Sequence, residues 1–527
     1  MSANVNIIVA IGGTGARVAE SFVYMAATGL LNPQIKNYIF VVDKDVNCGD
    51  TMRLKTTISD YNTMREYTGL DIPQIEEKEW VIDDAMLEIN PNAGADATFA
   101  QAAVNPGTQD VYLADLMHSE QEQAYKLNYG FYGHPSLGAG IYSLVANTDA
   151  FNNPARNRLF ETVNTELRAG NLVHVFLLGS VFGGTGASLF PSIARSMQQR
   201  FGNDPNFMQG GALMLPYFTF STETADGQVA SVRPDEFLEK TATALYHYSK
   251  EADLIRRDNY GRAEPNHKSA VFDELYLLGF IPLESTCRIY AAGGSDQVHS
   301  FSLADLYGAL AAVEFFNNQM TALAQGEAHL YSAHIPNENV IQWQDLPNAY
   351  LRQSAEHMVR FCESFLTVLY PMFLQPRSTL ESYVFLQNLY GSTKKMFSQP
   401  RANLPEDYDF AKTGGQIGPF CLKYLWYWQQ IQQRTDVSIR FFTPVLLQMI
   451  TYISDHEGKL NVPEYFVNNY SILLRDVFKP DALLLQPQNG TVKDALDLQN
   501  RLSKAPLDPK GFNDLQPIYR AAYGLMK

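Results

Sequence analysis

Residues 172–188 read Leu-Val-His-Val-Phe-Leu-Leu-Gly-Ser-Val-Phe-Gly-Gly-Thr-Gly-Ala-Ser. The first part, Leu172 to Leu178, is almost entirely apolar and predicts a buried strand, and the pattern from Leu189 to about Phe201 predicts a helix. A glycine turn between a strand and a helix points backbone N–H groups outward at the helix N-terminus, where they can hold an anion. The stretch therefore predicts one unit of a parallel α/β sheet with the geometry of a phosphate site.

The N-terminal residues repeat this arrangement. An apolar strand, Asn6 to Ala10, ends in the glycine turn Gly12 to Gly15, and Ala16 to Gly29 has the pattern of a helix. A second strand, Tyr38 to Val42, ends in Asp43-Lys44-Asp45. Strand, glycine turn, helix and strand form the opening of a parallel α/β sheet covered by helices on both faces. Tight packing at each turn is the alternative to a phosphate site.

The pattern of elements predicts two main parts. Residues 1–320 are expected to form the α/β domain, with 50–130 as an insertion of helices and loops. Residues 321–346 are expected to be a linker and loop, and 347–527 a mainly helical C-terminal domain. Proline and glycine between Gln399 and Pro419 predict a long loop there. The helices expected in the C-terminal domain are Tyr350–Leu374, Ser378–Tyr390, Cys421–Arg434 and Ser438–Ser454.

Composition and charge exclude several classes of function. With 40 basic and 56 acidic residues among 527, the net charge of -16 argues against a nucleic-acid partner. The four cysteines show no paired spacing, so neither a zinc module nor a disulfide framework is expected. The N-terminus lacks the basic region of a secretory signal, and no apolar run is long enough to cross a bilayer. A cytoplasmic protein without a membrane partner is therefore expected.

The second glycine turn fits neither the P-loop pattern nor the dinucleotide-binding pattern of Rossmann enzymes. Residues 176–188 instead resemble the signature segment of the tubulin/FtsZ superfamily, a strand followed by Gly-Gly-Gly-Thr-Gly-[Ser/Thr]-Gly and a helix. They depart from it at Phe182 and Ala187, where the family usually has glycine. The resemblance covers about residues 5–320 and is closest to divergent bacterial tubulin-like proteins. It implies a Rossmann-like parallel-sheet domain that binds GTP or GDP with Mg²⁺.

The resemblance also assigns the phosphate loops. The turn Gly12 to Gly15 matches the first loop, Asp43 to Asp45 the second, and Gly133 to Gly140 the third, although an ordinary turn explains the last equally well. Asp43 would face the phosphates and Asp45 would help hold magnesium, a cation that takes hard oxygen ligands. Capping of a helix or turn explains Asp43 equally well. The residues expected around the phosphates are Gly12, Gly13, Thr14, Gly15, Asp43, Gly138, Ala139, Gly140, Gly183, Gly184, Thr185 and Gly186.

The segment Phe301-Ser302-Leu303-Ala304-Asp305 resembles the start of the long central helix in archaeal-type FtsZ. The resemblance implies that Phe301 stacks on the guanine and that Asp305 reads its edge. The two side chains are one helical turn apart and share a face. A carboxylate only accepts hydrogen bonds, and guanine offers adjacent N1–H and N2 donors, so Asp305 favours GTP over ATP. A core phenylalanine and a solvated aspartate at a helix start are the alternative.

Two positions depart from the family. FtsZ has asparagine just after the first glycine loop, whereas this chain has Ala16-Arg17. Arg17, on the first turn of a helix beside the phosphates, could serve a charge-pairing role, but an exposed surface arginine is the preferred expectation. In the hydrolysis loop, the family's Asn-x-Asp-x-x-[Asp/Glu] is matched by Val340 to Asp345, with Gln342 in place of the first acid. The resemblance implies that Asp345 and Gln342 act on the nucleotide of the next subunit. Gln can orient a water but cannot take its proton, and Asp345 can equally cap a loop.

These observations lead to the hypothesis of a GTP-binding tubulin-like protein that self-associates head to tail, with hydrolysis at the subunit interfaces. The alternative is a nucleotide-regulated scaffold that does not hydrolyse GTP. Its partner protein would dock on the aromatic residues of the helical region, namely Tyr424, Trp426, Tyr427 and Trp428. A third reading, a Rossmann-type oxidoreductase with Asp43 on a ribose, explains neither the signature segment nor the Phe301/Asp305 pair.

Overall fold

The computed structural model describes residues 4–45, 47–80, 97–103, 115–127, 130–131, 133–153, 155–221, 234–255, 271–280, 284–289, 293–317, 329–333, 340–380, 382–387, 409–432, 438–442, 492, 495–505 and 515–526. These residues form two compact units. The first comprises residues 1–23, 34–58 and 73–337, and the second comprises residues 24–33, 59–72 and 338–527. The boundary between the units falls within two helices, α1 (Gly12–Ala27) and α2 (Gly49–Thr68).

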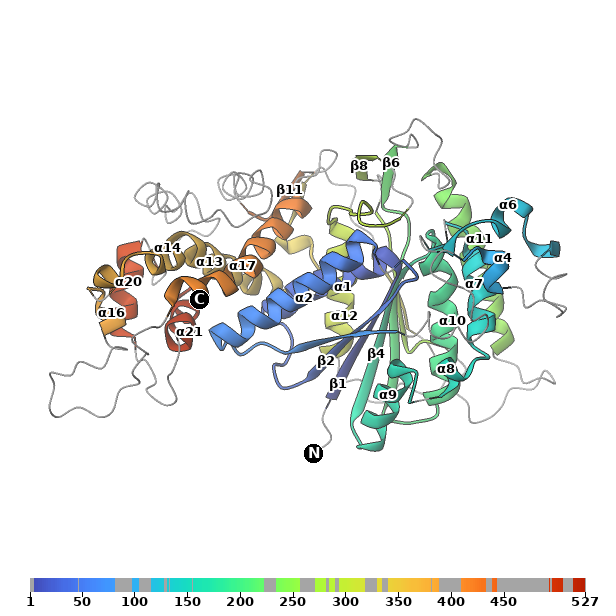
Figure 1. Ribbon diagram of the computed structural model, residues 1–527, viewed down its shortest axis with the longest axis horizontal. Helices are drawn as coiled ribbons and strands as arrows, with labels where there is room; N and C mark the ends of the chain where they lie inside the picture. Colours follow the sequence, from blue (N-terminus) through green and yellow to red (C-terminus); the bar gives the residue numbers. More distant parts are fainter. Residues whose placement is uncertain are drawn as a thin grey trace. The chain divides into compact units, whose positions relative to one another are not determined.

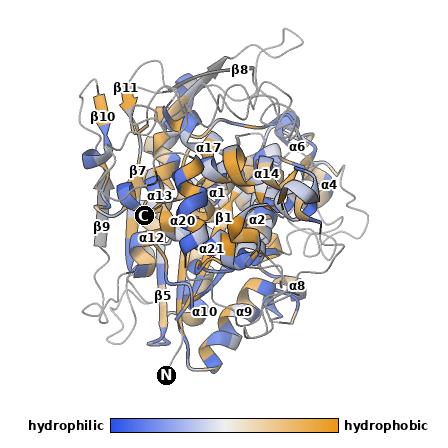
Figure 2. Ribbon diagram, turned by 90° about the vertical axis from the view of Figure 1, so that its left-hand side faces the viewer, coloured by the Kyte–Doolittle hydropathy of each residue, from blue (hydrophilic) through white to orange (hydrophobic). Residues whose placement is uncertain are grey.

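A seven-stranded sheet forms the core of the first unit. Its strand order is β3-β2-β1-β4-β5-β7-β9, and all neighbouring strands are parallel. The central strands are buried along almost their whole length, as expected of strands covered on both faces, and β1 is apolar throughout its middle (Figure 2). The strands are β1 (Asn4–Ile11), β2 (Lys36–Val42), β3 (Ile75–Glu79), β4 (Leu172–Ser180), β5 (Phe207–Met214), β7 (Glu274–Leu278) and β9 (His329–Ala333).

The sheet confirms the predicted α/β fold class. The segment 50–130, expected to be an insertion, contains most of α2 and the edge strand β3 of the main sheet. After β1 the chain adds β2 and β3 on one side of the sheet, and after β4 it adds β5, β7 and β9 on the other side. The direction of winding therefore changes between the neighbours β1 and β4. In open parallel sheets, ligands bind beyond the carboxyl ends of the strands at such a change of direction.

Helices cover both faces of this sheet. Figure 1 shows α7 and α10 on one side of the strands and α12 on the other, and Phe22 of α1 packs edge-on against Phe316 of α12. Two short strands, β6 (Phe218–Ser221) and β8 (Glu284–Ile289), pair outside the main sheet. The other helices of this unit are α4 (Phe99–Ala103), α6 (Glu120–Gln123), α7 (Pro135–Val145), α8 (Asp149–Asn152), α9 (Arg158–Arg168), α10 (Gly184–Phe201), the short turn Pro234–Glu236, α11 (Phe237–Ile255) and α12 (Leu303–Asn317).

The described part of the second unit is mainly helical. As predicted for 350–374, helix α13 (Leu351–Ser364) continues through a π-helical turn (Phe365–Leu369) into α14 (Tyr370–Phe373). The remaining elements are α15 (Arg377–Leu380), α16 (Val384–Gln387), α17 (Phe410–Gln432), α20 (Ala495–Lys504), α21 (Gln516–Leu525), and the parallel strands β10 (Val340–Gln342) and β11 (Ser438–Arg440).

Two local predictions in the second unit are wrong. A loop was expected from Gln399 to Pro419, of which residues 399–408 lie outside the described residues, but helix α17 begins at Phe410 and continues through Pro419. Phe420, the next residue, packs against Tyr24 and Tyr61, and this burial offsets the helix-breaking effect of the proline. The helix expected from Ser438 starts instead as strand β11, because these residues pair with β10 from far away in the sequence. Residues 443–454 of that expected helix lie outside the described residues.

The aromatic residues of α17 belong to the core rather than to a docking surface. Tyr424 and Tyr427 have no exposed surface, and Trp428 is 1% exposed. Tyr427 stacks on Tyr24 with ring centroids 4.5 Å apart. The proposal that these three side chains form an interface is therefore wrong, because they already fill the interior of the helical unit. Trp426 alone among the four is partly exposed.

Close approach of two strand ends requires glycine at position 15. A Cβ atom there would lie 2.5 Å from the carbonyl oxygen of Leu178 at the end of β4 and 3.0 Å from the carbonyl carbon of Ala10. Both neighbours are backbone atoms in buried strands, so they cannot move aside without distorting the sheet. The start of α1 is therefore fitted against β4.

We expect Gly15→Ala to lower the free energy of unfolding by about 2–3 kcal/mol, because overpacking against backbone forces the strands apart. Gly140→Ala is the matched control. A Cβ at Gly140 would lie 3.4 Å from Phe99, and alanine favours the interior of α7 by about 1 kcal/mol. Urea unfolding followed by circular dichroism measures both. Equal stability of Gly15→Ala and the control would contradict the close approach.

Candidate functional site

The change of winding direction places the two predicted glycine turns next to each other. Gly12 follows β1 with a φ of +69°, and a Cβ on it would lie 3.2 Å from Cβ of Thr185, in the turn after β4. These turns are far apart in the sequence, but β1 and β4 are neighbours in the sheet. Gly12 to Gly15 and Gly183 to Gly186 therefore line one edge of the sheet together.

Two long helices begin at this edge. Helix α1 starts at Gly12 and has 16 residues, and α10 starts at Gly184 and has 18. Neither has an acidic residue in its first turn, and Gly183 at the N-cap of α10 offers no side chain to its N–H groups. The partial positive charge of both N-termini faces this edge, so the arrangement favours an anion. The partly exposed residues at the edge are Gly13, Thr14, Gly183, Gly184 and Thr185.

Most of the third predicted loop, Gly133 to Gly140, lies within a helix. Helix α7 begins at Pro135, so Gly138, Ala139 and Gly140 are helical, and Ala139 is exposed. A Cβ on Gly138 would lie 2.2 Å from the hydroxyl of Ser188, so this glycine permits α7 to pack closely on α10. The expectation that these three residues form a loop is therefore wrong.

Gly133, the first residue of the predicted third loop, and Gly130, which sequence reasoning missed, approach the edge. Gly130 and Gly133 both have positive φ, and a Cβ on Gly130 would lie 3.6 Å from Oγ1 of Thr185. A Cβ on Gly184 would lie 3.0 Å from the backbone nitrogen of Gly133. This turn is the neighbour of the α10 N-terminus. Its signal in the sequence was the pair of glycines three residues apart just before α7.

Asp43 lies against the second glycine turn. Its Oδ1 is 3.5 Å from the hydroxyl of Thr185, which donates to it, and 3.3 Å from the backbone nitrogen of Asp45. Burial, together with the nearby charge of Asp45, raises the pKa of Asp43 from 3.8 to about 7. A carboxyl group and a hydroxyl side by side are hard oxygen donors of the kind that Mg²⁺ takes.

Asp45, the predicted magnesium residue, has both carboxylate oxygens engaged by the backbone. Oδ1 accepts a hydrogen bond from the N–H of Asn47 at 3.1 Å, and Oδ2 accepts one from the N–H of Gly294 at 2.6 Å. Asp45 therefore ties the segment after β2 to the loop around Gly294. Among the residues that the structure describes, no group of three or more His, Cys, Asp or Glu side chains is arranged to hold a metal ion.

Phe301 and Asp305 are fully buried and engaged inside the protein. Oδ1 of Asp305 accepts a hydrogen bond from the Tyr217 hydroxyl at 2.8 Å, and Oδ2 accepts the N–H of Ser302 at 2.9 Å. The guanidinium carbon of Arg53 lies 4.4 Å from the centre of the Phe301 ring. Both predicted base-binding side chains thus already have internal partners in this structure.

Arg17 organises this buried cluster. The expectation that it is exposed is wrong, since its side chain is 2% exposed. Its Nη1 lies 3.0 Å from Oδ2 of Asp50 and its Nε 3.5 Å from Oδ2 of Asp305, while Nη2 donates to the Tyr217 hydroxyl. The reason is that a buried guanidinium needs carboxylates, and α2 and α12 each bring one to it.

Asp50 is the second centre of the cluster. It also accepts a hydrogen bond from His299 Nδ1 at 2.8 Å and pairs with Arg53 at 3.3 Å. Burial alone would raise the pKa of Asp50, but the charges of His299 and Arg17 outweigh it and hold this pKa below its usual range. Sequence reasoning missed Asp50, although the acidic and basic residues three apart at the start of α2 were a signal.

The predicted hydrolysis residues belong to the second unit. Gln342 ends β10 and is exposed, and Asp345 ends a short helical turn (Trp343–Asp345). Oδ2 of Asp345 accepts the backbone N–H of Gln342 at 2.7 Å. In this structure Asp345 therefore caps the turn, which was the alternative to a catalytic role. The glycine turns belong to the first unit.

The raised pKa of Asp43 makes a prediction about stability in the absence of nucleotide and Mg²⁺. Asp43 ionises freely near pH 4 in the unfolded chain but only near pH 7 in the folded one, so stability decreases as pH rises from about 4 to 7. Asp43→Asn cannot ionise and should be about 2–4 kcal/mol more stable than the wild type at pH 8, with little difference at pH 4.5.

Thermal unfolding at both pH values measures this effect. Asp296→Asn, at an exposed aspartate, is the control and should change stability little at either pH. A stabilisation by Asp43→Asn of the same size at pH 4.5 and pH 8 would show that Asp43 is not the titrating group.

Comparisons with known proteins add distant structural similarity. No family model matches this sequence, and no curated protein is significantly similar to it. Among solved structures, CetZ from Methanosaeta thermophila strain DSM 6194 is 14% identical, with a TM-score of 0.27. The match covers 61% of this chain and 56% of that chain, so this chain spans little more than half of the matched protein. At such values the functional argument depends on the residues of this chain.

Proposed function

We propose that this protein binds a nucleoside triphosphate, with GTP as the expected ligand, beyond the carboxyl ends of β1 and β4. The observation that carries the proposal is the meeting of two glycine turns, each at the N-terminus of a long helix, where the winding of the sheet changes direction. Phosphate groups would accept hydrogen bonds from the outward N–H groups of α1 and α10. The turn at Gly130 to Gly133 would close the third side.

Asp43 and Thr185 are the proposed oxygen donors to a magnesium ion. Asp43 lies against the α10 N-terminus, and its pKa is raised by removal of the carboxyl group from water and by the nearby charge of Asp45. A divalent cation bridging phosphate oxygens and this pair would favour the ionised carboxylate. Asp45 would contribute by holding the segment in place through Asn47 and Gly294.

Selection of guanine by Asp305 couples base binding to the buried cluster. Both oxygens of Asp305 are engaged, by Tyr217 and by Ser302 with Arg17. Contacts of Asp305 with the N1–H and N2 donors of guanine would replace the bond from Tyr217. Likewise, a base that stacks on Phe301 would take the place of Arg53 over the ring. Guanine recognition in this site therefore requires rearrangement of the cluster.

Calorimetric titration of nucleotide-free protein with GTP, GDP, ATP and NAD, with and without Mg²⁺, tests the proposal. We expect GTP to bind more tightly than ATP or NAD. Thr185→Val keeps the shape of the side chain but removes its oxygen, and should weaken Mg²⁺-dependent GTP binding about tenfold, the usual size for one lost bond to a charged group. Thr165→Val, at an exposed position on α9, should bind GTP normally.

Binding of ATP and GTP with equal affinity would leave a nucleotide site that does not select guanine. Absence of binding by every nucleotide would overturn the proposal.

We further propose that subunits assemble head to tail, with Gln342 and Asp345 acting on the nucleotide of the next subunit. Asp345 caps the turn that it ends, so its replacement could lower turnover either by disturbing the turn or by removing a catalytic base. The experiment must distinguish these two effects. Asp345→Asn retains an acceptor for the Gln342 N–H but cannot take a proton. If Asp345 is the base, both Asp345→Asn and Asp345→Ala should lower GTP turnover at least tenfold with nucleotide affinity unchanged.

Loss of turnover in Asp345→Ala alone would assign only the capping role. A wild-type protein that binds GTP but neither hydrolyses it nor sediments with it would instead support the alternative function, a nucleotide-regulated scaffold. Trp426 is the partly exposed one of the four aromatic residues considered for this docking.

A further inference from the structure

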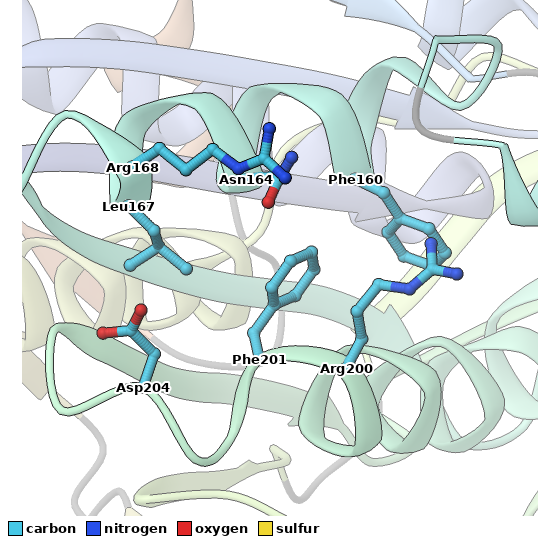
Figure 3. A pocket seen from close by; sticks show the side chains of 7 residues that line it. All are labelled: Phe160, Asn164, Leu167, Arg168, Arg200, Phe201 and Asp204. Carbon is cyan, nitrogen blue, oxygen red and sulfur yellow. The ribbon is translucent and has the colours of Figure 1, made fainter.

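A pocket of about 410 Å³ lies in the first unit, away from the glycine turns. It is lined by residues along α9, by the C-terminal end of α10 and by the turn that follows α10 (Figure 3). The volume is within the range of small-molecule sites. Its lining residues are Phe160, Asn164, Leu167, Arg168, Arg200, Phe201 and Asp204.

The pocket and the glycine turns lie at opposite ends of α10. This helix starts at Gly184 in the turn after β4 and ends at Phe201 in the pocket. At 1.5 Å per residue its 18 residues separate the two places by about 27 Å. The pocket is therefore not part of the proposed nucleotide site, and a ligand bound there would be a different one.

Aromatic rings form the apolar part of the pocket. Phe160 and Phe201 are buried and pack edge to face with centroids 6.0 Å apart. Figure 3 shows Phe201 and Leu167 directed into the space between the two helices. The two rings expose only 2% and 7% of their surface, so Leu167 and the exposed ring edges provide the contact for a flat or branched apolar group.

Two guanidinium groups and one amide flank the apolar part. Arg200 lies over the Phe160 ring, 4.5 Å from its centre, and donates to the carbonyl of Asn152 at 3.2 Å. The ring contact and this hydrogen bond hold the Arg200 guanidinium in place. The hydrogen bond uses one of its five N–H donors. Arg168 is exposed and has no ion-pair partner among the residues that the structure describes. Figure 3 shows Asn164 beside Arg168.

The local charge is opposite to that of the whole chain. The lining holds two arginines and one acid, whereas the chain has 40 basic and 56 acidic residues. The acid, Asp204, has a structural role, because its Oδ1 accepts the backbone N–H of Asn206 at 2.9 Å. Leu167 neighbours it in Figure 3, away from Arg200. The pocket therefore favours a ligand with one negative charge, placed near the two arginines, over a ligand with a second charge near Asp204.

We propose that this pocket binds a small organic acid, a carboxylate or sulfonate carried on an aromatic or branched apolar body. Its acid group pairs with Arg168 and Arg200, which offer planar donors suited to two acceptor oxygens. Asn164 supplies a further donor, and the apolar body lies on Phe160, Phe201 and Leu167. The competing explanation is that the two arginines only complement the C-terminal ends of α9 and α10.

Fluorescence titration of the full chain with 8-anilinonaphthalene-1-sulfonate tests the proposal, because this probe joins a sulfonate to aromatic rings. N-phenyl-1-naphthylamine, which lacks the charge, is the matched neutral probe. We expect Arg168→Gln and Arg200→Gln each to weaken binding of the sulfonate about tenfold, the effect of one lost charged hydrogen bond. Arg156→Gln, which removes the same charge from a position outside the pocket, should leave it within about twofold.

Competition then identifies the class of ligand. 4-Phenylbutyrate should displace the sulfonate probe, and 4-phenylbutyramide, its uncharged analogue, should not. The proposal is overturned if both arginine variants bind the sulfonate as the wild type does, or if the amide competes as well as the acid. It is also overturned if a glutamate-rich peptide displaces the probe and phenylbutyrate does not, because the pocket would then be a docking site for a protein.

Folding of the variants is checked separately. Arg168 is exposed at the end of α9, so Arg168→Gln should unfold at the wild-type temperature even if loss of the Phe160 contact destabilises Arg200→Gln. GTP titration should be unchanged in both variants, so the outcome for this pocket does not depend on the nucleotide proposal.

Discussion

The first unit depends on the close approach of the ends of β1 and β4. These two strands are neighbours at the point where the winding of the sheet changes direction, so the chain must leave both of them in the same small space. Glycine makes this possible: a Cβ on Gly15 would lie 2.5 Å from the Leu178 oxygen, and one on Gly186 would lie 2.6 Å from the Ser180 oxygen. Because α1 and α10 both begin there, their N-termini are brought together by the packing of the sheet. The proposed anion site would thus follow from backbone packing, with its side chains secondary.

Near the first glycine turn, the interior of the protein contains a cluster of buried charged side chains. Arg17, Asp50 and Asp305 are almost completely excluded from water and pair with one another, with Tyr217 and His299 completing the hydrogen bonds. Such a cluster adds little net stability compared with apolar packing, but it strongly penalises any arrangement that leaves one charge without its partner. The cluster joins α1, α2 and α12 to Tyr217, which directly precedes β6. These contacts fix the geometry around the first glycine turn. As a consequence of this cluster, Phe301 and Asp305, the two side chains expected to bind a guanine base, already contact other residues of the protein.

The second unit follows a different principle, in which aromatic packing determines the helices. Tyr24 and Tyr61, which come from the N-terminal part of the chain, contact Phe420 of α17, and Tyr24 also stacks on Tyr427. This buried aromatic cluster stabilises a helix that contains a proline, and it explains why residues 24–33 and 59–72 group with the C-terminal part of the chain. The helical unit is therefore assembled from segments that no local pattern connects.

The sequence by itself determined the parallel α/β fold and the two glycine turns between strand and helix. Apolar runs of strand length and glycine between strand and helix are local signals, and backbone geometry follows from them directly. Only the tertiary structure decided the partners of each charged side chain. Arg17 became buried because α2 and α12 each bring it a carboxylate, and Gly138 is needed for the contact of α7 with Ser188 on α10. The same holds for β11 and for the course of α17 through Pro419, since pairing with a distant strand and burial against distant rings are absent from any local window. Local pattern fixes the path of the backbone, whereas long-range packing decides which side chains meet.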